Sequence, residues 1–172
     1  DKDGRFLPPQ NYSRDALVSA TTHDLPTLAG FWLGRDIEVR RNAGLLPDEA
    51  AYQRMRQERD VEKQRLLDLL HSLQLLPDWF ARDVRHVPEL TGEIHNAIVG
   101  LLASTPSKLM LLNQEDLLKE TEQQNLPGST EQYPNWRRKT KCTVEELWGS
   151  PEVQAFTQMF RSWLERTGRL NV

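Results

Sequence analysis

The chain has 172 residues and a formal net charge of −3 when its four histidines are neutral. That length is enough for one domain with a core of its own. The acidic balance argues against a dedicated nucleic-acid or anionic-membrane surface, so we expect neither nucleic acid nor a membrane as a partner. The single cysteine, Cys142, excludes an internal disulfide and any metal site built from several cysteines.

No apolar run approaches the roughly 18 residues of a membrane span, and no signal-peptide pattern is present. We therefore expect a cytoplasmic protein. The first residue is Asp1 rather than methionine, which favours a piece cut from a longer protein.

The stretch 16–27 reads as a short apolar run, a polar corner and the start of a helix. The apolar run, 16–20, is too short for a helix and predicts a strand buried on both faces. In α/β proteins, ligands gather at the carboxyl ends of strands, so His23 and Asp24 are the first candidate functional residues. The alternative is structural: Asp24 is a good helix N-cap with Pro26 in the first turn, and His23 is an ordinary corner residue.

Two helical segments are expected after this corner. The first should end near Gly44, and residues at helical spacing form its buried face. The second starts at Leu45–Glu49 and passes through a mixed-sign charged segment, 53–64, that we interpret as a solvated helix face. Pro77 and Pro88 then bracket a short segment of uncertain structure. The buried face of the first helix is expected to comprise Leu25, Leu28, Ala29, Trp32 and Leu33.

The clearest helical pattern covers residues 89–104, where apolar residues recur at the spacing of one helix face. After a break at Pro106, the run 108–112 predicts a second buried strand, parallel to the first. It ends in a second polar corner, 113–116. The pattern predicts a mainly α chain with two short parallel strands joined by a long helical crossover.

Residues 120–141 form a polar stretch whose prolines and glycine predict an ordered loop. Thr143 and Glu146 have the spacing of a capping box and predict a short helix. The pair Ser150-Pro151 suits the start of a last helix, which Gly168 ends. Its expected inner face comprises Val153, Phe156, Phe160, Trp163 and Leu164.

Two motifs resemble those of one enzyme family. The segment SATTHDLPTLAGFW resembles the His-Asp motif of the amylomaltases, the bacterial and plant 4-α-glucanotransferases. The segment NQEDLLKETEQQNLPGSTEQYPNWRRK is similar to the family's loop after the eighth barrel strand, whose Asn-x-Pro-Gly turn lines the sugar cleft. The similarity extends over essentially the whole chain, and the two motifs agree in order and spacing.

The resemblance implies a fold. The chain, 1–172, would be a single fragment, the C-terminal quarter of a (β/α)8 TIM barrel, made of the last two β/α units with 44–88 as a helical insertion. A complete barrel needs about 250 residues, and two strands cannot close one. We therefore expect the N-terminal remainder of the barrel as a partner. We also expect exposed strand edges that favour self-association of the fragment.

The resemblance also implies an activity. Enzymes of this family are retaining 4-α-glucanotransferases, which move α-1,4-glucan segments between maltooligosaccharides through a covalent glycosyl-enzyme and need no cofactor. Asp24 resembles their third catalytic carboxylate, which stabilises the transition state, and His23 resembles the neighbour that hydrogen-bonds sugar hydroxyls. Asn125 would contact substrate, while Pro127 and Gly128 would shape the turn. The family's nucleophile and acid/base lie on earlier strands, so we expect this chain alone to be inactive.

Two of the substrate-binding candidates have structural alternatives. Asn125 is equally well explained as an Asx-turn residue. Trp136 suits stacking on a sugar, because an aromatic ring matches the C–H face of a pyranose, but we favour a role as a core anchor. A different class of function also stays open for the whole chain, a non-catalytic α-helical module that binds a glucan or a protein.

Other candidate sites are weaker. His71, His86 and His95 lack the spaced histidine or cysteine partners of a metal site, so we expect none. The basic run 137–141, with aromatic residues nearby, imitates a nucleic-acid patch. The acidic balance of the chain favours a solvated loop there instead.

Overall fold

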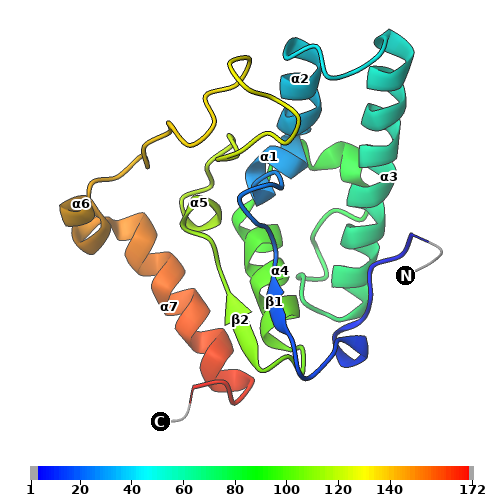
Figure 1. Cartoon of the computed structure of the whole chain (residues 1–172). Coiled ribbons are helices and arrows are strands. Elements are labelled where there is room, and N and C mark those ends of the chain that lie inside the picture. The colour runs from blue at the N-terminus through cyan, green and yellow to red at the C-terminus, as the bar shows by residue number, and fades with distance from the viewer. Residues whose placement is uncertain (1–3, 171–172) are drawn as a thin grey trace.

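The computed structural model describes residues 4–170 as a mainly helical chain with one small sheet (Figure 1). Two short parallel strands lie side by side, and a long, mostly helical crossover joins them, which confirms the predicted element order. Within residues 4–170, no helix is both long and apolar enough to cross a membrane. The elements are η1 Pro9–Asn11, β1 Leu17–Ser19, α1 Leu28–Leu33, α2 Arg35–Asn42, α3 Glu49–Ser72, η2 Val84–His86, α4 Gly92–Ala103, β2 Leu109–Leu111, α5 Gln114–Leu117, α6 Val144–Gly149 and α7 Pro151–Arg166.

The two strands pair in register, with Leu17 opposite Leu109 and Ser19 opposite Leu111. Their carboxyl ends therefore meet at one edge of the sheet, and both polar corners follow at that edge. Val18 is only 5% exposed, whereas Leu17 is 54% and Leu109 61% exposed. The prediction that both strands are buried on both faces is therefore wrong within this chain, because its helices cover only the side on which Val18 packs.

The predicted single helix up to Gly44 is divided into α1 and α2 by Gly34. Gly34 has a φ of 72°, a left-handed conformation that side chains disfavour, so it ends α1 and redirects the chain. Thr27 caps α1, since its side chain accepts a hydrogen bond from the Gly30 N–H. Leu25, which the spacing placed on the buried face, precedes the helix and is exposed.

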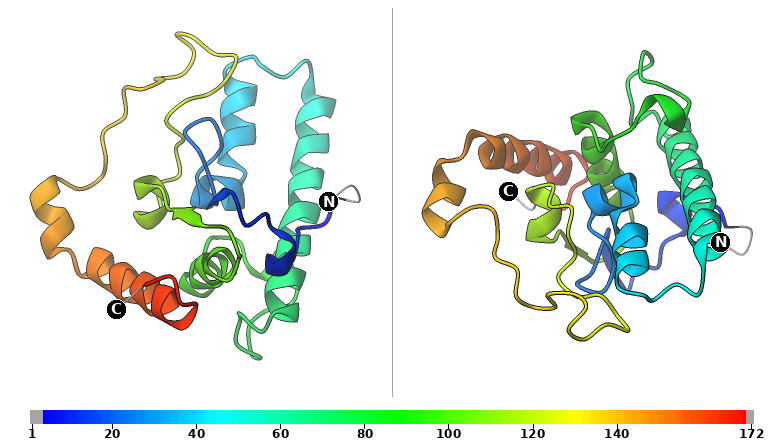
Figure 2. Two further views of the ribbon diagram at one scale, coloured as in Figure 1. Left: turned by 60° about the horizontal axis from the view of Figure 1, so that its bottom comes forward. Right: turned by 90° about the horizontal axis from the view of Figure 1, so that it is seen from above.

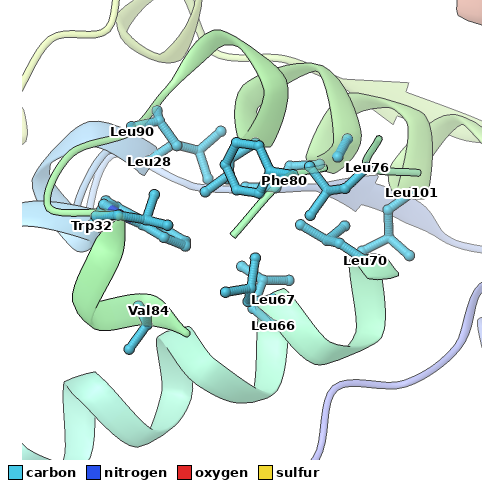
Figure 3. Packing of buried hydrophobic residues seen from close by; sticks show 14 of the residues in the cluster. Leu28, Trp32, Leu66, Leu67, Leu70, Leu76, Phe80, Val84, Leu90 and Leu101 are labelled. Atoms are coloured by element: carbon cyan, nitrogen blue, oxygen red, sulfur yellow. Dashed lines mark hydrogen bonds between the residues drawn. The ribbon is translucent and has the colours of Figure 1, made fainter. Parts of the chain in front are cut away.

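The main core lies between α3 and α4, and Figure 3 shows its side chains in contact from several elements. Helix α3 begins after its cap Asp48, within the predicted start at 45–49, and contributes the fully buried Leu67 and Leu70. Trp32 of α1 closes one end of the cluster and donates its indole N–H to the Val87 carbonyl at 2.8 Å. Each such apolar side chain contributes about 1.5–3 kcal/mol on burial, so this cluster is what fixes α1 relative to α3 and α4.

Two cations of the charged segment of α3 are buried rather than solvated. Arg59 makes a bidentate ion pair with Asp36 of α2 at 2.8 and 2.9 Å, and its guanidinium lies 4.1 Å from the centre of the Phe31 ring. Lys63 lies 5.3 Å from the centre of the Trp32 ring, and burial lowers the pKa of its ammonium. The prediction of a solvated face therefore holds for only part of the segment, because these two side chains attach α3 to α1 and α2.

The C-terminal arm follows the sequence patterns closely. Helix α7 packs along α4, and the loop after α5 arches away from the sheet before it reaches α6 (Figures 1 and 2). The predicted capping box is present, with both hydrogen bonds between Thr143 and Glu146 formed. Ser150 caps α7, and Gly168, at φ 70°, follows its end. Residues 120–141 form the predicted ordered loop.

Candidate functional site

The first polar corner is a loop between β1 and α1, which we call the corner loop and define as residues 22–27; its residues 22–25 are exposed and Thr27 is buried. It contains His23 and Asp24, whose side chains are 57% and 49% exposed. Because Thr27 caps α1, the alternative in which Asp24 is the helix cap is wrong. The Asp24 carboxylate therefore makes no capping hydrogen bond to α1 and is partly open to a ligand.

Asn125, from the loop after α5, reaches across to the corner loop. Its side-chain Nδ2 donates a hydrogen bond to Asp24 Oδ1 at 2.6 Å, and its backbone N–H donates to the His23 carbonyl at 3.1 Å. On the other side, His23 Nε2 lies 3.4 Å from Asp24 Oδ2. The structure therefore joins three of the residues that the sequence singled out. The Asx-turn alternative for Asn125 is wrong, because the side chain bonds to Asp24 rather than to its own turn.

Trp136 completes one side of this group. Its ring centre lies 5.1 Å from that of His23, and the residue is 64% exposed, so the expected core-anchor role is wrong. The backbone at Trp136 has a φ of 59°, and its N–H donates to the Gln124 carbonyl at 2.9 Å. A left-handed conformation is unfavourable for a bulky residue, and such strain is common at ligand-binding positions.

A cavity of about 380 Å³ opens at the carboxyl ends of the two strands, beside the corner loop. Its wall includes the rings of His23 and Trp136 together with the polar side chains of Asn113 and Glu115. Asp24 and Asn125 stand beside this wall, next to His23. The cavity is thus lined by aromatic surface, hydrogen-bonding side chains and the Glu115 carboxylate, which suits a polar ligand with apolar faces.

Pro127 and Gly128 lie at the exposed tip of the turn rather than at the corner loop. Gly128 has a φ of 87°, which a side chain would strain. Asn135 closes the turn, since its Oδ1 accepts from the Leu126 N–H at 2.8 Å and its Nδ2 donates to Ser129 Oγ at 2.9 Å. The described residues show no hydrogen bond from this tip to the corner loop, so the structure does not bring Pro127 and Gly128 together with His23 and Asp24.

Sequence reasoning missed the residues beneath the corner loop. Asp116 is fully buried and accepts hydrogen bonds from Thr21 Oγ1 and from the Leu28 N–H. Burial raises the pKa of its carboxyl above the ordinary value, against the lowering effect of those two donors. Asn113 donates to the same Thr21 hydroxyl at 2.7 Å. The polar run 113–116 after a predicted strand was a signal, but it did not distinguish the buried carboxylate of Asp116 from the partly exposed one of Glu115.

The remaining polar candidates have structural partners. His71 Nε2 lies 3.0 Å from the Ala81 carbonyl oxygen, and His95 is buried against the Phe156 ring. In the basic run, Arg138 bonds to Glu122 at 3.0 Å, while Arg137 is mostly exposed, as in a solvated loop. Across residues 4–170, no group of three or more histidine, cysteine or acidic side chains is placed to hold a metal ion.

Comparison with known proteins gives consistent matches along the chain. A family profile described as 4-alpha-glucanotransferase, glycoside hydrolase family 77, matches residues 1–144. A 4-alpha-glucanotransferase of Haemophilus influenzae is 30% identical over 155 residues, which cover 90% of this chain and 22% of that protein. One of Mycobacterium tuberculosis is 34% identical over 136 residues, which cover 78% of this chain and 17% of that protein.

A solved structure agrees with the sequence matches. The crystal structure of amylomaltase from Corynebacterium glutamicum superimposes with a TM-score of 0.76 at 26% identity, covering 89% of this chain and 23% of that one. The chain therefore spans less than a quarter of the length of each of these relatives. Since the profile covers most of the sequence and carries both motifs of the site, the chain belongs to the 4-alpha-glucanotransferase family, glycoside hydrolase family 77.

Proposed function

We propose that this chain is part of a retaining 4-α-glucanotransferase, to which it contributes the third carboxylate and loops of the sugar cleft. The observation that carries the proposal is the Asp24–Asn125 hydrogen bond, which joins the family's two motifs across the carboxyl ends of the strands. The named relatives have the same activity in their descriptions. The activity, the glucan substrates and the roles of the site residues are proposed for the longer protein of which this chain would be a part.

The proposed chemistry divides the work between this chain and the rest of the protein. In retaining transfer, a carboxylate attacks the anomeric carbon while a carboxylic acid about 5–5.5 Å away protonates the departing glycosidic oxygen. The hydroxyl of an acceptor sugar then attacks the anomeric carbon of the glycosyl-enzyme and displaces the carboxylate nucleophile. Its proton goes to the residue that acted as the acid in the first step. We assign both of those carboxylates to the part of the longer protein that lies outside residues 1–172. Asp24 would accept hydrogen bonds from hydroxyls of the sugar ring as it flattens, and strengthen them in the transition state.

The other side chains of the site would bind and orient the glucan. His23 offers a ring nitrogen to sugar hydroxyls, and Trp136 offers a flat face to the C–H groups of a pyranose. Asn125 holds Asp24 in place through one hydrogen of its side-chain amide. The other hydrogen and the oxygen of that amide would be available to substrate. None of these roles requires a cofactor.

The same proposal accounts for the exposed side of the sheet. Leu17, Leu109 and Leu111 are exposed, although their strands pair as buried parallel strands do. We assign that side to the N-terminal remainder of a (β/α)8 barrel, of which residues 1–172 are one fragment and the C-terminal quarter. Residues 44–88 are then a helical insertion. An isolated fragment would expose these leucines and tend to self-associate.

The test is disproportionation of maltotriose. The full-length protein that carries this chain should release glucose and form longer maltooligosaccharides, whereas this chain alone should form neither. Activity of the purified chain alone would show that the nucleophile and the acid/base lie within it. An inactive full-length protein that still binds maltooligosaccharides would instead support the non-catalytic binding module.

A further inference from the structure

The corner loop has little packing of its own to hold it. Thr22, His23, Asp24 and Leu25 are all exposed, and the loop lies outside the core clusters. Exposed loops with few buried contacts open easily, yet a catalytic carboxylate must be held to within a fraction of an ångström. Something other than apolar burial must therefore fix the position of Asp24.

Asp116 bonds to both ends of the corner loop. One carboxylate oxygen accepts from the hydroxyl of Thr21, the residue before the loop, and the other accepts from the N–H of Leu28, the residue after it, at 2.7 Å. Asn113 strengthens the first end by donating to the Thr21 carbonyl and to its hydroxyl, at 2.8 and 2.7 Å. Because Asp116 is only 2% exposed, water does not compete for these hydrogen bonds.

Further hydrogen bonds join the loop to the same part of the chain. Thr27 Oγ1 donates to the Glu120 carbonyl at 2.5 Å, and the Asn125 N–H donates to the His23 carbonyl at 3.1 Å. Every one of these partners lies within 113–125, the segment that follows β2. The corner loop is thus held by the second β/α segment in addition to the cap that Thr27 provides to α1.

We propose that Asp116 and Thr21 are positioning residues for catalysis, which hold both ends of the corner loop so that Asp24 meets the sugar in the reactive geometry. This inference rests on the proposed function. Thr21 lines the cavity and Asp116 lies beneath it, and we assign to both a role that acts through the position of Asp24. A misplacement of about 1 Å at such a site lowers turnover on the order of 100-fold, so the buried bonds act on kcat through Asp24.

Three variants of the full-length protein test the proposal. Thr21→Val keeps the shape of the side chain and removes the hydroxyl, and we expect kcat on maltotriose to fall about 10- to 100-fold with KM changed less than about threefold. Thr21→Ser keeps the hydroxyl and should retain wild-type kcat. Asp36→Asn is the matched control, since it alters another buried carboxylate, one that pairs with Arg59 of α3 rather than with the ends of the corner loop, and should lower the melting temperature without this selective loss of kcat.

A double-variant cycle shows whether Thr21 acts through Asp24. In an Asp24→Asn background, Thr21→Val should lower the remaining activity less than about threefold, because the group that it positions is already disabled. Hydrogen exchange measured by mass spectrometry gives a second readout, with faster exchange of residues 22–28 in Thr21→Val but not in Asp36→Asn. An equal loss of kcat in both backgrounds, or unchanged exchange in the corner loop, overturns the inference. Full activity of Asp24→Asn, or an inactive wild type, refutes the proposed function, while the exchange comparison still tests the positioning.

Discussion

At the scale of single residues, the site depends on a carboxylate that is held without being buried. Asp24 is half exposed, yet its two oxygens lie near Asn125 and His23. A fully buried carboxylate would lose its ability to take up a substrate, and a free one would sample many rotamers. The side chains of Asn125 and His23 restrict the Asp24 carboxylate while leaving some of its lone pairs open to a ligand.

His95 gives the chain a residue whose protonation opposes folding. It is buried beside Phe156, and its Nε2 has no hydrogen-bond partner among residues 4–170. Burial, and then the charge of Lys119, lower the pKa of its imidazole to about 4. The folded protein therefore keeps a neutral ring at pH values where the unfolded chain, with a pKa near the ordinary 6.5, already binds a proton.

The sign of the pH dependence follows from that depressed pKa. The contribution of His95 to the free energy of unfolding is complete above about pH 6.5 and is lost as the pH falls to about 4, by about 3 kcal/mol in total. His95→Phe should keep the ring contact and remove this loss. Melting temperatures of the full-length protein at pH 7 and pH 5 check it, since the variant should lose less on acidification than the wild type. Equal losses would show that His95 does not titrate as described.

At the scale of elements, the contact between α4 and α7 depends on one glycine. Trp163 of α7 is buried on α4 and donates its indole N–H to Asn96 Oδ1 at 2.8 Å. A Cβ on Gly100 would lie 2.5 Å from an atom of the Trp163 ring, nearer than real contacts allow. The two helices can approach this closely only because Gly100 lacks a side chain.

Gly100→Ala should therefore destabilise the protein although alanine favours helices. We expect a loss of about 1–3 kcal/mol, because the Trp163 ring must move out of its place. Gly92→Ala is the matched control, since it has the same chemistry on α4 and no atom within 4 Å of the added Cβ. Denaturant unfolding followed by tryptophan fluorescence measures both, and an equal stability of the two variants would contradict the described packing.

At the scale of the whole molecule, local signals in the sequence predicted local structure well. The two parallel strands, the capping box at Thr143 and the His23–Asp24 corner follow from patterns of neighbouring residues, and all are present. The division at Gly34 was missed because a glycine within an apolar spacing pattern reads equally well as a tolerated helix residue.

Long-range features were the ones that sequence could not supply. The burial of Asp116 depends on Thr21 and Leu28, which are 95 and 88 residues away along the chain. The exposure of Trp136 likewise depends on the position of the corner loop, and the exposure of Leu109 depends on which side of the sheet the helices cover. Such contacts arise only when distant segments meet, so residue spacing carries no signal for them.

The most direct test of the account is glucose release from maltotriose by the full-length protein with Asp24→Asn. Asp15→Asn is the matched control, because it neutralises another exposed carboxylate, one paired with Lys108 before β1. Circular dichroism should show that both variants are folded. We predict that turnover falls about 100-fold or more in Asp24→Asn and stays at the wild-type level in Asp15→Asn. Wild-type turnover in a folded Asp24→Asn protein would contradict the assignment of Asp24 as the third carboxylate.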